Sequence, residues 1–92
     1  MTNAEIAAVF GEIAGMLRVK KDNIFKVRAY EKVARSINEL DVSVEQLAAD
    51  GKLATIPGAG EAIIKKITEL VTTGKLGYYE KLKAELAGSG KP

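Results

Sequence analysis

One short stretch, residues 55–60, constrains the fold of this chain more than any other. It places Pro57, Gly58 and Gly60 within four residues, and an apolar segment with helical periodicity follows directly. Proline fixes φ and removes a hydrogen-bond donor. Glycine allows backbone conformations closed to other residues and lets a foreign group approach the main chain. The stretch therefore predicts a tight turn that leads into a helix beginning at Gly60 or Glu61.

A helix that begins at this turn leaves its first N–H groups unpaired, which makes a site for an anion such as phosphate. We expect the N–H groups of Gly58 and Gly60 to face that anion. A Pro-Gly turn can also be a plain connection between two helices, and that alternative stays open. Apolar residues at helical intervals around the turn favour the hairpin and second helix of a helix-hairpin-helix element; they are Leu53, Ile56, Ile63, Ile67 and Leu70.

Aliphatic residues at helical spacing run through the rest of the chain and predict an all-α fold. Sequences typical of capping boxes at residues 2–5 and 43–46 begin two of the helices. We expect one domain over residues 1–87, a bundle of four to five helices made of two helix-hairpin-helix units with both connections on one surface. A flexible tail or linker follows at 88–92. The expected helices span about 3–18, 26–40, 44–49 and 61–73, and a fifth begins at Gly77.

Composition excludes several classes of function. The chain has no Cys and no His, so we expect neither disulfides nor zinc sites, histidine bases or Ser-His triads. No apolar run approaches the ~20 residues that span a bilayer. The first residues lack the basic-then-apolar order of a signal peptide. We therefore expect a cytoplasmic protein without an organic cofactor or a membrane partner.

Charge is segregated along the chain although the net charge is only +2. Residues 18–35 carry a local charge of +5 and residues 65–83 one of +3, and the acidic stretch 39–61 between them carries −4. Within the first block, Arg28, Lys32 and Arg35 fall opposite the apolar stripe of the expected helix. A solvated face is one interpretation. The shortage of nearby acidic residues favours an anionic partner.

Several blocks together resemble the N-terminal domain of family X DNA polymerases. In animals this is the small lyase domain of DNA polymerase beta, and the bacterial forms are more similar to this chain. The resemblance covers residues 3 to about 84. It implies a SAM-like domain that grips DNA near a gap or a 5′ end in DNA repair, joined to the rest of a polymerase and associated with the bacterial nucleoid. The blocks are residues 23–30, 34–37, 56–60, 63–67 and 73–76.

The resemblance also implies site residues. A monovalent cation, Na⁺ or K⁺, would be held by the backbone carbonyls of Ala54, Ile56 and Ala59. Some members of the family remove a 5′-deoxyribose phosphate through a Schiff-base lysine, and the matching position is Lys66, with Tyr30 near the same pocket. The implied DNA contacts are Lys26, Arg28, Gly58, Ala59, Gly60, Lys65, Lys66 and Lys75.

The chemistry of Lys66 can also be read from its position. Lys66 falls about 100° from the centre of its helix's apolar stripe and Lys65 points away from it, given a turn of 3.6 residues. Partial burial and neighbouring cations disfavour an ammonium group, and a free amine is the nucleophile that forms an imine. The alternative is a boundary lysine whose stem covers apolar surface. Phe25 and Tyr78 depart from the family pattern, because lyase-active relatives carry His and Lys there.

Glu61 and Ala62 depart from the pattern as well, since they replace polar or basic residues.

Three hypotheses follow from the sequence. The domain is a sequence-independent DNA-binding module, a 5′-deoxyribose-phosphate lyase that acts through Lys66, or a helical protein-interaction module.

Overall fold

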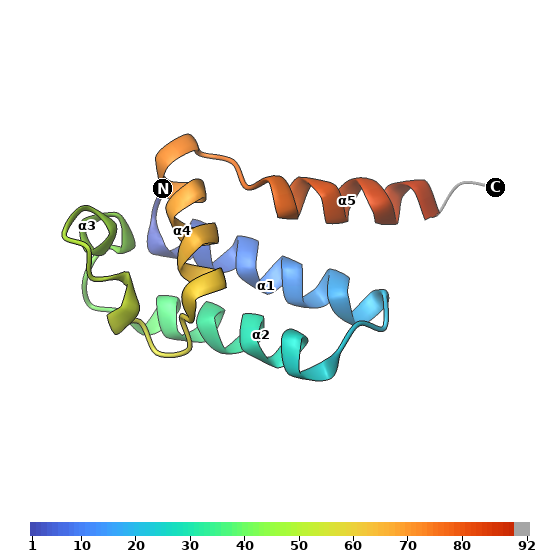
Figure 1. Cartoon of the computed structure of the whole chain (residues 1–92), viewed down its shortest axis with the longest axis horizontal. Helices are drawn as coiled ribbons and strands as arrows, with labels where there is room; N and C mark the ends of the chain where they lie inside the picture. Colours follow the sequence, from blue (N-terminus) through green and yellow to red (C-terminus); the bar gives the residue numbers. More distant parts are fainter. Residues whose placement is uncertain (90–92) are drawn as a thin grey trace.

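The fold is entirely helical over residues 1–89, the part of the chain that the computed structural model describes. Five α-helices and one 3-10 helix make up this part, and it contains no strand (Figure 1). The predicted all-α class is therefore confirmed. In chain order the elements are α1 (Asn3–Val19), α2 (Ile24–Glu39), α3 (Val44–Ala49), η1 (Leu53–Thr55), α4 (Glu61–Thr73) and α5 (Gly77–Ser89).

The largest differences from the expected helix bounds are at the start of α2 and the end of α5. The α2 helix begins at Ile24, two residues early, because the Asn23 side chain accepts a hydrogen bond of 2.8 Å from the Phe25 N–H and caps the helix. The α5 helix runs to Ser89, past the domain boundary expected at residue 87. The remaining residues of the predicted tail, 90–92, lie outside the described part.

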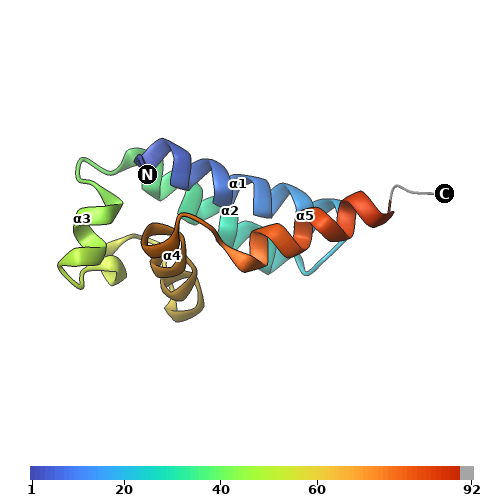
Figure 2. The same cartoon turned by 90° about the horizontal axis from the view of Figure 1, so that it is seen from above.

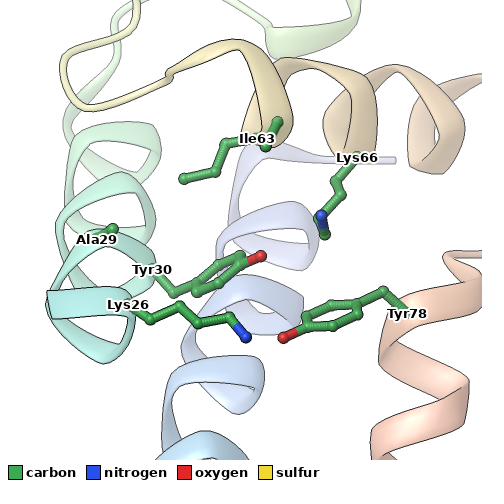
Figure 3. A pocket seen from close by; sticks show the side chains of 7 residues that line it. Lys26, Ala29, Tyr30, Ile63, Lys66 and Tyr78 are labelled. Atoms are coloured by element: carbon green, nitrogen blue, oxygen red, sulfur yellow. The ribbon is translucent and has the colours of Figure 1, made fainter. Parts of the chain in front are cut away.

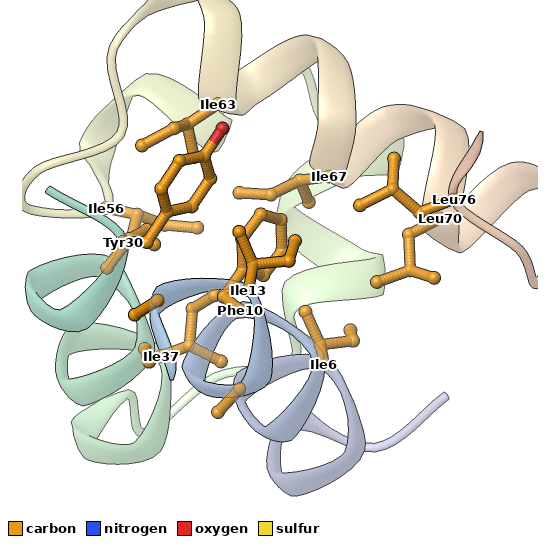
Figure 4. Packing of buried hydrophobic residues seen from close by; sticks show 14 of the residues in the cluster. Ile6, Phe10, Ile13, Tyr30, Ile37, Ile56, Ile63, Ile67, Leu70 and Leu76 are labelled. Carbon is orange, nitrogen blue, oxygen red and sulfur yellow. The ribbon is translucent and has the colours of Figure 1, made fainter. Parts of the chain in front are cut away.

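The α1 and α2 helices lie side by side in both views and form the long body of the molecule (Figures 1 and 2). Their facing stripes supply most of the buried core, and α4 closes it from one side (Figure 4). The Phe10 and Tyr30 rings stack there, 6.1 Å apart between centroids. Burying each large aliphatic side chain contributes about 1.5–3 kcal/mol. The fully buried side chains include Ile6, Phe10, Ile13, Ile37, Ile56, Ile67 and Leu76.

The α5 helix runs beside α1 in the same direction (Figures 1 and 2). The Gly77 N–H donates a hydrogen bond of 2.8 Å to the Glu69 carboxylate, which ties the start of α5 to α4. Farther along, the Tyr79 hydroxyl bonds Glu12 at 2.9 Å, and Glu85 pairs with Lys20 at 3.0 Å. Leu82 adds a buried apolar contact.

The two helix connections lie far apart along the molecule, and not side by side (Figures 1 and 2). The α1–α2 turn lies at one end of the long axis in both views, and the hairpin turn at residues 56–60 lies toward the other end (Figures 1 and 2). The reason is helix length. With 17 and 16 residues, α1 and α2 are more than twice as long as the six-residue α3. Their turn is therefore carried well beyond the second helical pair.

Candidate nucleic-acid interface

The hairpin turn at residues 56–60 is closed by its own backbone and stays at the surface. The Ala59 N–H donates to the Ile56 carbonyl at 3.0 Å, and the Gly60 N–H donates to the Gly58 carbonyl at 3.1 Å. Gly58 has a φ of +87°, a conformation that favours glycine. Pro57, Gly58 and Gly60 are all exposed. An outside group can therefore reach the turn.

The start of α4 is uncapped. Its N-cap residue is Gly60, which has no side chain to accept a hydrogen bond. Within residues 1–89, no hydrogen bond is made by the N–H groups of Glu61, Ala62 and Ile63, nor by that of Gly58. These donors and the positive end of the helix dipole suit an anion. The Gly60 N–H, expected to face that anion, is instead used inside the turn.

The carbonyls expected to hold a cation remain able to accept. Pro57 has no N–H, so it cannot donate to the Ala54 carbonyl three residues earlier. Neither Ala54 nor Ala59 accepts a hydrogen bond through its carbonyl in the described residues, and Ile56 accepts one, from Ala59. Carbonyl oxygens suit hard cations, and each of these three oxygens keeps a lone pair free for a ligand. No cluster of His, Cys, Asp or Glu that could hold a metal occurs among residues 1–89.

Lys32 lies against the hairpin turn, which the sequence did not indicate. A Cβ atom placed on Gly58 would meet the Lys32 Cγ and Cδ atoms at 3.2 Å, so the lysine stem packs on the glycine. The sequence placed Lys32 only on an exposed cationic side of its helix. Its contact joins two elements separated by 26 residues, and periodicity within a helix carries no information about such a contact.

The predicted DNA-contacting residues fall in three places. Gly58, Ala59 and Gly60 form the hairpin turn, and Lys65 is exposed on α4 as expected. Lys75 follows the far end of α4, a 13-residue helix. At about 1.5 Å per residue, that end lies roughly 20 Å from the helix start. A phosphate at the turn therefore does not reach Lys75. The remaining predicted cations are Lys26 and Arg28 on α2 and Lys66 on α4, which lines a pocket with Lys26.

A pocket of about 360 Å³ lies between α2, α4 and α5 (Figure 3). It brings together Lys66 and Tyr30, which the family resemblance placed near one lyase pocket, and Lys26, which the resemblance implied as a DNA contact. Lys66 is half-buried there, as its position at the edge of the apolar stripe predicted. The full lining is Lys26, Ala29, Tyr30, Ala62, Ile63, Lys66 and Tyr78. We call this space the lysine pocket.

Tyr78 is the centre of the lysine pocket. The Lys66 Nζ lies 4.8 Å and the Lys26 Nζ 5.9 Å from the centroid of the Tyr78 ring, so both ammonium groups make cation–π contacts (Figure 3). The Tyr30 ring stacks 6.1 Å away at an angle of 20°. The Tyr78 hydroxyl is buried and has no hydrogen-bond partner within the described residues. The hydroxyl lies close to Lys26 and Tyr30, and its proximity helps to raise the pKa of both groups.

The protonation states of Lys26 and Tyr30 also favour an anionic or strongly polar ligand in the lysine pocket. Burial opposes the charge on Lys26, but Tyr78 and Asp22 outweigh it and raise the pKa of Lys26. Burial, with Tyr78 adding to it, raises the pKa of Tyr30 far above the usual range of tyrosine. At neutral pH, Lys26 is therefore a cation and Tyr30 a neutral phenol. Both are hydrogen-bond donors.

Phe25 and Tyr78, two of the four departures from the polymerase pattern, behave differently. Tyr78 lines the lysine pocket, so the replacement of a lysine there changes the pocket directly. Phe25 does not line it, and 75% of its surface is exposed at the start of α2. Glu61 is exposed at the first position of α4, where it suits the helix dipole but opposes a bound phosphate.

The exposed glycine turn and the all-helical fold define a helix-hairpin-helix module. The chain belongs to the helix-hairpin-helix domain family, whose model matches residues 1–76. This membership indicates a nucleic-acid-binding domain and supports DNA as the partner. A comparison with curated proteins finds no match. The matched region ends one residue before α5 begins, so Tyr78 lies outside it.

No helix in the described part of the chain is long and apolar enough to span a bilayer.

Proposed function

We propose that this domain binds the DNA backbone, independently of base sequence, through the hairpin turn and the first turn of α4. Its preferred substrate is a gap or a 5′ end, and it acts in cytoplasmic DNA repair as the N-terminal domain of a bacterial family X polymerase. The observation that carries DNA binding is the row of unpaired amides at an exposed glycine turn. The repair context depends on the resemblance of residues 23–30 and 56–60 to that polymerase domain.

The contacts follow from the chemistry of phosphate. The N–H groups of Gly58, Glu61 and Ala62 donate to phosphate oxygens, and the exposed Lys65 adds charge. These groups contact the backbone and read no base edges, so binding is independent of sequence. If about three phosphates are neutralised, the slope of log affinity against log salt is roughly −2 to −3.

An amide-shift titration with gapped duplex DNA tests this function. The duplex is used with and without a 5′-phosphate, at two salt concentrations. We expect shifts concentrated at residues 58–66, weaker binding at higher salt, and tighter binding to the phosphorylated end. An affinity that is indifferent to salt, or shifts that avoid the hairpin turn, would contradict the proposal.

A monovalent cation, Na⁺ or K⁺, is part of the same proposal. The carbonyls of Ala54, Ile56 and Ala59 would bind it, and the cation would attract the phosphate that the turn holds. Replacing K⁺ with tetramethylammonium at constant ionic strength removes the small cation and keeps the screening. We expect weaker DNA binding and altered carbonyl ¹³C shifts at these three residues. Unchanged affinity argues against the cation.

A 5′-deoxyribose-phosphate lyase is the second candidate function, favoured by the lysine pocket. The Lys66 amine would attack the C1′ aldehyde of the sugar, and loss of water would give an imine. Removal of a C2′ proton would then expel the 3′ phosphate ester by β-elimination. Lys26 and the Tyr30 hydroxyl line the same pocket and could bind the phosphate or the leaving oxygen.

Borohydride trapping tests the lyase function, and the chain offers a matched control. Lys66→Ala removes the candidate amine, whereas Lys81→Ala removes an exposed lysine of α5 that does not line the pocket. We expect a trapped protein–DNA adduct in the parent and in Lys81→Ala, and none in Lys66→Ala. A parent protein that forms no adduct, or an undiminished adduct in Lys66→Ala, eliminates this function.

A protein-interaction module is the remaining alternative, motivated by exposed apolar side chains. Phe25 is 75% and Val19 is 69% exposed near the α1–α2 turn. The same titration decides this point. DNA-induced shifts at the hairpin turn exclude protein interaction as the sole function, and a protein without any DNA-induced shift leaves it as the better explanation.

A further inference from the structure

We infer that the exposed side of α2 is a second DNA-contact surface, continuous with the hairpin turn. Its residues are Arg28, Lys32 and Arg35, which we call the α2 basic row. The inference rests on the proposed DNA binding and extends it: the domain grips two adjoining segments of phosphate backbone, one at the hairpin turn and one along α2.

Lys32 is the physical link between the two surfaces. Its Cγ and Cδ atoms would lie 3.2 Å from a Cβ atom on Gly58, so its stem rests on the hairpin turn. The ammonium group follows the Cε atom, which would lie 3.6 Å from the same point. Because the stem is already packed, Lys32 loses less side-chain conformational entropy on binding a phosphate than an ordinary surface lysine does. The Lys32 charge is therefore held beside the unpaired Gly58 amide.

The α2 basic row differs from the neighbouring cations in having no acidic partner. Arg18 pairs with Glu31 at 2.6 Å, Lys20 with Glu85 at 3.0 Å, and Lys26 with Asp22 at 3.6 Å. Among the described residues, no ion pair reaches the row. Even Glu39, four residues after Arg35 on the same helix, does not pair with it. The row is thus a set of positive charges without a direct ion pair in the described part of the chain.

The length of the row matches a backbone segment. Arg28 and Arg35 are seven residues apart on one helix, which corresponds to about 10 Å at 1.5 Å per residue. One strand of a duplex carries a phosphate about every 3.4 Å along its axis, so the row runs past roughly three phosphates. The hairpin turn lies alongside α2 (Figure 1). A strand held at the turn therefore continues onto the row.

Charge-removing variants test the row, with salt dependence as the readout. Lys32→Met keeps an unbranched apolar stem against Gly58 and removes the charge, whereas Lys32→Ala removes both. The combined Arg28→Gln, Lys32→Met, Arg35→Gln variant removes the row. Lys81→Met, at an exposed lysine of α5, is the matched control. The probe is the gapped duplex at four salt concentrations, and circular dichroism checks folding.

If the α2 basic row contacts about three further phosphates, the parent slope is about twice the −2 to −3 expected for the hairpin turn alone. We expect it to become shallower by about 1 in Lys32→Met and by roughly 2 to 3 in the combined variant, at about 0.9 per phosphate. Lys81→Met should retain the parent slope. In the parent titration, amide shifts should extend from the hairpin turn to Arg28, Lys32 and Arg35.

The inference and the proposed function fail in different ways. A parent slope in the combined variant, with hairpin shifts intact, overturns the α2 surface and leaves the hairpin function standing. If Lys32→Ala weakens DNA binding and Lys32→Met leaves it unchanged, the α2 surface is also overturned, because packing of the stem would then be the whole contribution of Lys32. A parent protein that binds no DNA contradicts both the proposed function and this inference. If such a protein bound an acidic protein through the row, the row would belong to that class of partner.

Discussion

Two helix starts in this domain, those of α2 and α4, solve the same problem in opposite ways. Each helix follows a tight turn and begins with N–H groups that have no partner inside the helix. At α2, the Asp22 carboxylate accepts from the Asn23 N–H at 2.6 Å, and the Asn23 side chain accepts from the Phe25 N–H at 2.8 Å. At α4, the N-cap residue is Gly60, and no side chain caps the helix.

The difference separates a structural turn from a binding turn. Asp22 and Asn23 satisfy local donors, so the α2 start has little to offer a ligand. Glycines at the α4 start leave the donors bare and remove the side chains that would obstruct a phosphate. The family match covers both turns, yet only the second presents the chemistry of an anion site. The predictions that follow test this contrast, from the largest expected effect to the smallest.

The largest effect is expected from Gly58→Val. A side chain at φ +87° is strained, and its Cβ atom would also press on the Lys32 stem at 3.2 Å. Strained backbone of this kind costs about 1–3 kcal/mol, and DNA binding should be lost as the turn and Lys32 shift. Urea unfolding and a DNA titration measure the two effects.

Gly51→Val is the matched control for that variant. Gly51 has a φ of +68° but open space around its Cβ position. It should therefore show the strain without the contact with Lys32, and it should keep DNA binding. Equal destabilisation of the two variants with normal DNA binding in both would contradict a special role for the Gly58 turn.

Asn23→Ala should have the next largest effect, and on stability alone. Loss of an N-cap side chain destabilises a helix by about 1 kcal/mol. Because the α2 start is capped for structural reasons, DNA affinity should stay at the parent value. Thermal unfolding and a parallel DNA titration check both parts. A clear loss of affinity in a folded Asn23→Ala protein would place the α1–α2 turn in the binding surface.

Gly60→Ser should move stability and binding in opposite directions. Nothing lies within 4 Å of a Cβ atom at Gly60, so the side chain fits. Its hydroxyl would cap α4, adding a few tenths of a kcal/mol, and would compete with phosphate for the same amides. Gly60→Ala fits equally well but offers no acceptor, so it should bind DNA as the parent does. Tighter DNA binding in Gly60→Ser would break the contrast between the two turns.

The smallest effect is a pH dependence confined to the capped turn. The hydrogen bond from the Asn23 N–H lowers the pKa of Asp22, against the opposing effect of burial and with help from Lys26 and Lys20. A lowered folded-state pKa gives stability that is present above the unfolded pKa and lost as the pH falls through the folded pKa. The Asn23 amide shift should therefore titrate at a lower pH than an ordinary aspartate does, and the Gly58 amide shift should stay constant. A Gly58 amide that follows the Asp22 titration would show that the two turns are coupled.

Sequence periodicity predicted the helices and the sides on which their residues lie. It placed Lys66 at the edge of the core and Lys65 in solvent, since both positions depend only on the helical repeat. It missed the contact of Lys32 with Gly58 and the central place of Tyr78 in the lysine pocket. Both depend on how separate helices cross. Crossing angles come from packing of whole surfaces, which a local pattern does not encode.

The attachment of α5 has a consequence for how this domain could diversify. Tyr78 stands on a helix that starts just past the matched family region, and the contacts of that helix with Glu12 and Lys20 lie at the surface. The lysine pocket is thus formed by α2 and α4, which lie within the matched family region, and by Tyr78 of α5, a helix outside that region. Exchange of that helix would alter the chemistry inside the pocket, while the exposed glycine turn remained as it is.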